Sequence, residues 1–235
     1  MNNKYSYIGI TFIVLIFGIY VVRNLDNRIT NDIILDNNRL NKKNVVVSNK
    51  SDLFTYSEVP SFEFKNQYGQ TIDNKSFEGK VYVVEFFFTT CPSICPLMTQ
   101  KMLDIQNEFL DNTNVGMASI SITPETDTPA VLKEYADLNG ITHKNWHLLT
   151  GKSTEIVFDL SNKGFKLYTG LDQDSNHGGF EHSGLFALID KNGNIRSRID
   201  EQGNPILYYR ALEENGFPDQ IKELKEDIKI LLDES

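Results

Sequence analysis

The two cysteines of the chain both lie in one short stretch, residues 86–99, which reads FFFTTCPSICPLMT. Cys91 and Cys95 are separated by three residues and follow a run of β-formers. This pattern predicts a strand-to-helix junction at the carboxyl end of a buried strand, with Pro96 in the first helical turn. Free backbone N–H groups and the helix dipole at such a junction favour thiolate over thiol. The pair can therefore bind a soft metal ion, close a small disulfide or carry out thiol–disulfide exchange.

The four histidines supply candidates for a third ligand. His182 opens the predicted strand HSGLFALID beside the cysteine junction and is the best placed of them. His177 lies in the Gly-rich stretch DSNHGGFEH and is predicted to be exposed, with an auxiliary ligand as the alternative. His143 and His147 flank Trp146 and are predicted to be surface or packing residues. Two thiolates with one imidazole suit copper, and thiolates alone suit Cu(I).

Three further side chains lie close in sequence to these candidates. Met98 and Met102 fall on the same predicted helical face as the cysteines. A thioether can bind Cu(I), but methionines at helical spacing are more often core packing, which is the prediction for both. Glu181 precedes His182, and neighbouring strand residues point to opposite faces, so Glu181 is a weak candidate for an outer contact.

The segments around the cysteines alternate between strand and helix patterns. KVYVVEFFFTT and VGMASISI read as buried strands, and residues 62–72 as a β-hairpin. Helices are expected over residues 96–109, 129–140 and 152–162, and from about residue 219 onward. A second hairpin turns at Asn192-Gly193. The order predicts an α/β fold, a mixed sheet flanked by helices.

The amino-terminal segment predicts a membrane anchor. Residues 5–22 read YSYIGITFIVLIFGIYVV without a charge, and at ~1.5 Å per residue they reach ~27 Å as a helix. A cleaved signal peptide is the alternative, but no small-x-small cleavage site follows. We expect a transmembrane anchor over residues 1–22, an Asn-rich tether over 23–51 and the folded domain over 52–235.

The charge of the chain argues against a nucleic-acid partner. Its net charge is −9, and phosphate binding requires clustered Lys and Arg. Residues 53–235 hold 16 of the 23 basic and 28 of the 32 acidic residues, a net charge of −12. An acidic domain favours a basic partner surface.

The sequence resembles the Sco/SenC family of membrane-anchored copper-binding proteins. The matching motifs are FFFTTCPSICPLM, SITPETDTPAVLKEYA, NWHLLTG and HSGLFALIDKNGNIR, in the order found in the family. Ser93 and Thr123 stand where many members have Asp. The resemblance implies a thioredoxin-like fold, with copper, as Cu(I) or Cu(II), bound by Cys91, Cys95 and His182.

The resemblance also implies a function and a location. A member would deliver copper to the dinuclear copper site of cytochrome c oxidase subunit II, or to another recipient, from a domain that faces the periplasm on a single-pass inner-membrane anchor. The alternative is an enzyme, a thiol–disulfide oxidoreductase that reduces the cysteines of that site. Cys91 would then be the nucleophile and Cys95 the resolving thiol. A peroxidase of the peroxiredoxin type fits the cysteine motif less well.

Overall fold

The computed structural model describes residues 14–17, 53–172, 179–214 and 216–234. Contacts divide the chain into two units, residues 1–52 and residues 53–235. Residues 14–17 are helical and exposed. The rest of the predicted anchor and tether lies outside the described residues. Within the described ranges, no helix is long and apolar enough to cross a membrane.

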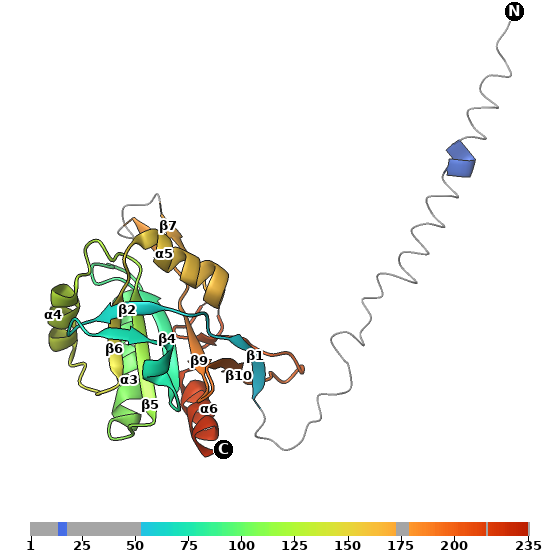
Figure 1. Ribbon diagram of the computed structural model, residues 1–235. Coiled ribbons are helices and arrows are strands. Elements are labelled where there is room, and N and C mark those ends of the chain that lie inside the picture. Colours follow the sequence, from blue (N-terminus) through green and yellow to red (C-terminus); the bar gives the residue numbers. More distant parts are fainter. Residues whose placement is uncertain (1–13, 18–52, 173–178, 215, 235) are drawn as a thin grey trace, which may run out of the picture. The chain divides into compact units, whose positions relative to one another are not determined.

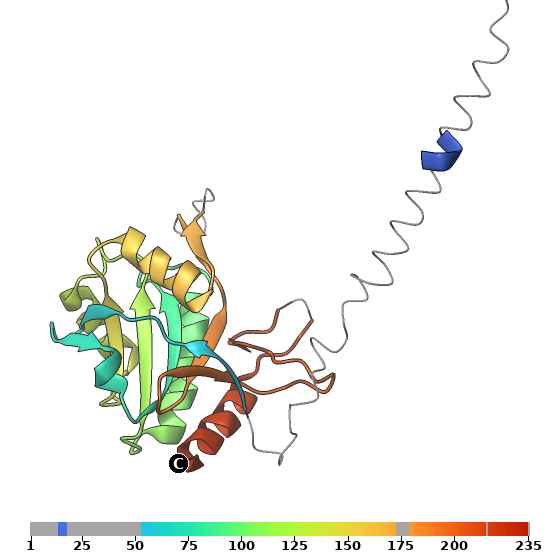
Figure 2. The same ribbon diagram turned by 45° about the vertical axis from the view of Figure 1, so that its right-hand side comes forward.

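The second unit alternates strands and helices, as Figures 1 and 2 show. Its strands are β1 (Phe54–Glu58), β2 (Glu63–Asn66), β3 (Thr71–Asp73), β4 (Val81–Phe87), β5 (Val115–Ser121), β6 (Trp146–Thr150), β7 (Thr169–Leu171), β8 (Phe180–His182), β9 (Leu185–Ile189), β10 (Asn194–Ser197) and β11 (Tyr209–Arg210). Its helices are η1 (Asn74–Phe77), α3 (Cys95–Phe109), α4 (Pro129–Asn139), α5 (Thr154–Asp159), η2 (Leu160–Phe165) and α6 (Ile221–Asp233).

The larger sheet has the strand order β1-β10-β9-β4-β5-β6-β2-β3, and β11 pairs with β9. The strands β4, β5 and β6 run parallel to one another, whereas β9, β10, β1 and the β2–β3 hairpin pair antiparallel. Every residue of β4 and of β5 is buried, as their apolar runs predicted. The prediction of a mixed α/β sheet is confirmed.

Helical segments cover both faces of this sheet. Phe86 and Phe87 are neighbours on β4 and therefore point to opposite faces. The Phe87 ring packs against Tyr135 of α4, and the Phe86 ring packs against Phe165 of η2. On the Phe87 face, α3 is joined to α4 by a hydrogen bond between Thr99 and Tyr135 and to α6 by ion pairs from Glu108.

The boundaries of α4 agree with the sequence. The Thr128 hydroxyl accepts a hydrogen bond from the Val131 N–H, Pro129 takes the first helical position, and Gly140 ends the helix with φ 72°. Thr128 is thus the cap, and the preceding residue, Asp127, is buried.

The segment after β6 differs from its prediction. One helix over residues 152–162, ended by Gly164, was expected. Instead α5 continues into the π-helix η2, which ends at Lys166 with φ 54°. A glycine is needed at 164 for packing, because a Cβ there would lie 2.5 Å from Pro60 Cγ. The short strands β1, β7 and β11 were not predicted, since they carry little of the period-two pattern that marks a strand.

Candidate metal centre

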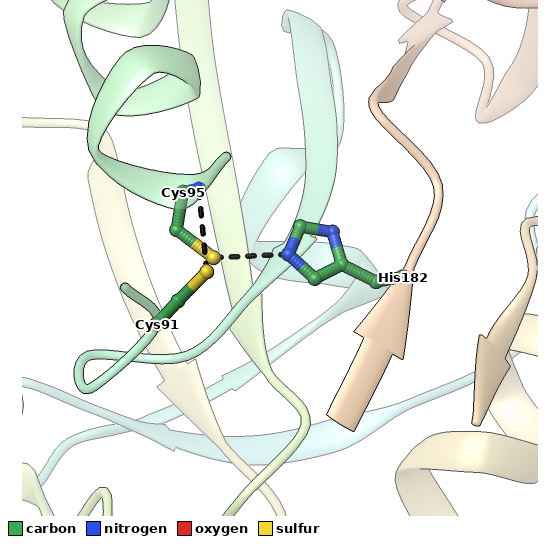
Figure 3. Close-up of side chains that lie close together, drawn as sticks. All are labelled: Cys91, Cys95 and His182. Carbon is green, nitrogen blue, oxygen red and sulfur yellow. Dashed lines mark hydrogen bonds between the residues drawn. The ribbon is translucent and has the colours of Figure 1, made fainter. Parts of the chain in front are cut away.

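Cys91, Cys95 and His182 come together at the carboxyl end of β4 (Figure 3). Cys91 lies in the loop that follows β4, Cys95 is the first residue of α3, and His182 is the last residue of β8. The two sulfurs and one ring nitrogen lie within 4.8 Å of one another. Within the described ranges, no other group of three His, Cys, Asp or Glu side chains meets in this way. The three residues singled out from the sequence therefore share one site.

The way in which the two cysteines meet differs from the prediction. Cys91 lies ahead of α3, so the two cysteines do not share one helical face with Met98 and Met102 as predicted. A turn in the loop, with the Cys91 N–H bonded to the Phe88 carbonyl, brings the Cys91 sulfur to the start of α3. There the Cys95 N–H donates to it at 3.5 Å. The Cys91 sulfur thus accepts a hydrogen bond from one of the backbone N–H groups at the start of the helix, which have no partner within the helix.

The two thiols are free and have unequal acidity. Hydrogen bonding from the Cys95 side chain, with smaller contributions from the Ser93 hydroxyl and the Cys95 N–H, lowers the pKa of Cys91 to about 3. Burial, together with the hydrogen bond to Cys91 and its negative charge, raises the pKa of Cys95. The pair therefore holds one thiolate, on Cys91, and one thiol, on Cys95.

The His182 ring is oriented for ligation. Its Nδ1 lies 3.2 Å from the Ser183 carbonyl, which can only accept, so Nδ1 carries the hydrogen. The other nitrogen, Nε2, keeps its lone pair and lies 2.9 Å from the Cys95 sulfur. A carbonyl that fixes the tautomer in this way is the usual support of a metal-binding histidine.

The placement of His182 in the fold corrects one expectation. It was predicted to open the strand HSGLFALID, but it closes the separate strand β8, and the residues 183–184 stand between it and β9. The strand β8 pairs with β7, so that His182 lies opposite Thr169. The two-stranded sheet of β7 and β8 thus positions the His182 imidazole beside the two cysteines.

The three side chains of the site are largely buried. Cys91, Cys95 and His182 are 7%, 1% and 6% exposed. The Phe88 ring packs edge-on against His182 and also against Phe180. An apolar wall lowers the local dielectric, which favours a bound ion whose charge the thiolates offset.

The ligand set fits a soft metal ion. Donors bound to one first-row ion at about 2.0–2.3 Å lie at most about 4.6 Å apart, close to the spread of these three atoms. Two sulfurs and one nitrogen suit copper, and three soft donors suit Cu(I) in particular.

The remaining candidates fall outside this cluster or outside the described residues. His143 and His147 are packing residues, as predicted: the His143 ring contacts the Phe109 carbonyl and the His147 ring contacts Asn66. Met98 and Met102 are fully buried in the core. Glu181 is exposed on β8, and His177 lies outside the described residues.

One buried carboxylate supports the cysteine loop and was not recognised from the sequence. Asp127 is fully buried and accepts from the Thr89 N–H at 3.1 Å and from the Thr89 hydroxyl at 2.5 Å. The hydroxyls of Ser121 and Thr123 donate to it at 2.6 and 3.1 Å. Asp127 therefore ties the loop that carries Cys91 to the end of β5.

The fold and the site together define a thioredoxin-like protein with a soft-metal ligand set. The SCO1/SenC family model matches residues 50–215. The chain belongs to the SCO1/SenC family, as its motifs indicated. It is 30% identical over 169 residues to the SCO1 protein homolog of Bacillus subtilis (strain 168), a match that covers 72% of this chain and 81% of the relative.

Solved structures show the same fold. BsSco, a member of the Sco family of cytochrome c oxidase assembly proteins in which a disulfide switch was identified, is similar with a TM-score of 0.63 and 28% identity, over 78% of this chain and 98% of that one. Copper-bound ScoI of Bradyrhizobium japonicum is similar with a TM-score of 0.54 and 23% identity, over 75% of this chain and 100% of that one. At that identity the likeness to ScoI shows the fold alone.

Proposed function

We propose that this protein is a membrane-anchored copper metallochaperone that holds Cu(I) or Cu(II) through Cys91, Cys95 and His182. The observation that carries the proposal is the meeting of three soft donors within 4.8 Å in a buried, partly aromatic setting. Membership of the SCO1/SenC family supports copper as the cargo. No described acidic side chain joins the cluster, which disfavours a hard cation.

The proposed recipient is the dinuclear copper site of cytochrome c oxidase subunit II. It is supported by the family resemblance and by the assembly role given for BsSco. Transfer would proceed by ligand exchange, in which the recipient's thiolates replace Cys91 and Cys95 one at a time. Cys91, the more exposed of the two, is the sulfur that an incoming ligand would displace first.

The proposed location is the inner membrane, with a single-pass anchor and the folded domain in the periplasm. The uncharged segment at residues 5–22 supports the anchor. The family resemblance supports the periplasmic side.

An anaerobic Cu(I) titration of the full chain in detergent tests the proposal. Wild type should bind one copper ion per chain, and the Cys91→Ser, Cys95→Ser double variant should bind none tightly. His182→Ala should lose more affinity for Cu(II) than for Cu(I), because two thiolates can satisfy Cu(I) alone. The matched variant His177→Ala should bind as wild type does. Stoichiometric, tight binding by the double variant would refute the ligand assignment.

A second function, thiol–disulfide exchange, is favoured by the unequal acidity of the two thiols. The Cys91 thiolate would attack a target disulfide and form a mixed disulfide. The Cys95 thiol would then attack the Cys91 sulfur, give its proton to the departing target thiolate and leave a Cys91–Cys95 disulfide, so that two electrons pass to the target. Exchange does not require His182, so a His182→Ala variant that kept reductase activity but lost Cu(II) binding would separate the two functions.

A further inference from the structure

Three large apolar side chains are exposed on segments next to the metal centre. Leu97 lies in the first turn of α3, two residues after Cys95, and is 55% exposed. Leu171 ends β7 and is 71% exposed, and Phe217 lies between β11 and α6 and is 62% exposed. Single exposed apolar side chains are common, but a group of them around a reactive site indicates a contact surface. We term these three side chains the apolar rim.

Leu171 shares a face of the small β7–β8 sheet with the ligand His182. In the pairing of the two strands, Thr169 lies opposite His182. Leu171 lies two residues further along β7, opposite Phe180. Residues two apart on a strand point to the same side, and so do residues directly opposite on paired strands. This face is turned toward the metal centre, because the Phe88 ring packs against both Phe180 and His182.

Phe217 packs beside the strand that follows His182. The Arg210 guanidinium carbon lies 5.5 Å from the centre of the Phe217 ring. Arg210 on β11 pairs with Leu185, the first residue of β9. Phe217 therefore lies against the β9–β11 pair, and β9 begins three residues after the histidine ligand.

The segment that carries Phe217 is also joined to α3. Asp219, two residues after Phe217, forms an ion pair with Lys101 at 3.0 Å. Lys101 lies four residues after Leu97, so the two side chains share one side of the helix. Phe217 and Leu97 therefore border the metal centre from neighbouring elements.

The charged side chains beside Phe217 leave a surplus of negative charge. Lys101 is engaged in its ion pair, and Arg210 lies against the Phe217 ring. Glu213 and Glu214 are exposed and form no ion pair within the described residues. Glu214 lies directly beside the ring-bearing residue, because the backbones of Glu214 and Phe217 exchange two hydrogen bonds. An apolar surface with a negative border favours a protein partner that carries Lys or Arg, and it disfavours an anionic lipid surface.

A protein that takes the metal ion by ligand exchange must cover the surface around the centre, because its thiolates have to reach the ion. Even a small interface covers about 600 Å² of each partner, a disc about 14 Å in radius. Two residues span at most about 7 Å along a strand and about 3 Å along a helix. Leu97, two residues from Cys95, and Leu171, two residues from the position opposite His182, therefore fall inside such a disc.

We propose that the apolar rim is the docking surface for the protein that receives the copper. The partner that fits it presents an apolar contact face bordered by Lys or Arg beside its own metal-binding thiolates. The inference rests on the proposed copper-transfer function. Because Leu97, Leu171 and Phe217 are not ligands, they set how fast the transfer complex forms and leave the affinity for copper unchanged.

Copper transfer at a series of recipient concentrations tests the rim. The Cu(I)-loaded full chain in detergent is mixed anaerobically with copper-free cytochrome c oxidase subunit II, the proposed recipient. The copper content of the separated subunit II is then measured over time, which gives a second-order rate constant. A parallel reaction replaces subunit II by the small Cu(I) chelator bicinchoninate, which needs no docking surface.

Leu97→Ser and Phe217→Ser should each lower the rate constant for transfer to subunit II about tenfold, since each removes a large apolar contact from the interface. Both variants should keep the wild-type affinity for Cu(I) and the wild-type rate of loss to bicinchoninate. Leu110→Ser is the matched control, because Leu110 is 46% exposed at the other end of α3, about 20 Å from Leu97 along the helix. It should transfer copper as wild type does.

The negative border is tested by the Glu213→Gln, Glu214→Gln double variant. Its transfer to subunit II should be slower than that of wild type and should depend less on the salt concentration, because charged borders act mainly on the rate of association. An identical salt dependence in the two proteins would contradict a basic partner.

Wild-type transfer rates to subunit II in both Leu97→Ser and Phe217→Ser would overturn the docking rim and leave the proposed function standing. Equal slowing of transfer to subunit II and to bicinchoninate would also overturn it, because the variants would then act on the copper site itself. A dimer of the full chain, seen by sedimentation and dissociated by Phe217→Ser, would assign the rim to a second copy instead. No transfer from copper-loaded wild type would overturn the proposed function, and the rim with it.

Discussion

Cys91 and Cys95 differ in charge although they share one site. The backbone at the start of α3 and the neighbouring thiol both donate toward the Cys91 sulfur, which stabilises its thiolate. Cys95 is more deeply buried and faces His182, so it keeps its proton until a metal ion or a disulfide bond replaces it. The Cys91 sulfur is therefore the reactive thiolate, and the Cys95 thiol reacts only once it loses its proton.

Ser93 helps to lower the pKa of Cys91, because its hydroxyl lies 3.5 Å from the Cys91 sulfur. Ser93→Asp should place a negative charge beside the thiolate and raise the pKa of Cys91 by about one unit or more. The pH dependence of alkylation by iodoacetamide measures this pKa. Ser93→Ala, which removes the hydroxyl without adding charge, should give a smaller increase. An unchanged or lower pKa in Ser93→Asp would contradict the assignment of Ser93.

The Cys91, Cys95 and His182 cluster could be predicted from the sequence, but the roles of two buried carboxyls could not. The spacing of the two cysteines and the position of the histidine near a strand can both be recognised in the sequence. Glu85 and Asp127 are hydrogen-bonded to residues more than thirty positions away, Ser119 and Thr89, and the sequence does not show those contacts. The visible signal for Glu85 was a single charge inside an apolar strand.

At the scale of elements, the carboxyl ends of β4 and β5 are joined by one buried side chain. Asp127→Asn replaces an acceptor-only group by an amide that must donate at one end, leaving at least one of the hydroxyl or N–H donors unpaired. The free energy of unfolding should fall by about 2 kcal/mol, and Cu(I) affinity should fall with it because Thr89 anchors the Cys91 loop. Denaturant unfolding measures the first effect.

The matched control for this change is Asp137→Asn on the exposed face of α4. Its effect should be within about 0.5 kcal/mol of wild type. If Asp127→Asn were equally neutral, the buried hydroxyl cluster would not hold the loop.

The strand β4 should also give the fold a distinctive pH dependence through Glu85. The pKa of Glu85 is about 7 in the fold against an ordinary 4.5, so the fold favours the protonated form. The resulting stabilisation is fully present below the unfolded pKa and is lost as pH rises through about 7. It amounts to about 3 kcal/mol.

Denaturant unfolding at a series of pH values, about 4 to about 8, should therefore show a steeper loss of stability in wild type than in Glu85→Gln. Parallel curves for the two proteins would show that Glu85 titrates as an ordinary carboxyl.

Most helices and strands could be predicted from local sequence. Those that could not be predicted depend on contacts between distant residues or are very short. The buried runs of β4 and β5 and the capped helix α4 are set by local residues. In the π-helix η2, which follows α5, Gly164 packs closely against Pro60, far away in the sequence. The strand β8 is short and pairs only with β7, so its three residues resembled the start of β9.

At the scale of the whole molecule, the uncharged amino-terminal segment predicts a membrane location for the protein. We predict that residues 5–22 remain in the mature protein and hold it in the membrane. After cell fractionation the full chain should sediment with membranes and resist carbonate extraction, and a chain without residues 1–22 should be soluble. A mature amino terminus beyond Val22 would contradict this.

X-ray absorption at the copper edge of the Cu(I)-loaded full chain in detergent tests the copper ligands most directly. We predict a copper shell of two sulfurs and one nitrogen, from Cys91, Cys95 and His182. The sulfur contribution should disappear in the Cys91→Ser, Cys95→Ser variant. A shell of nitrogen and oxygen alone in wild type, or a spectrum unchanged in the double variant, would show that copper binds elsewhere.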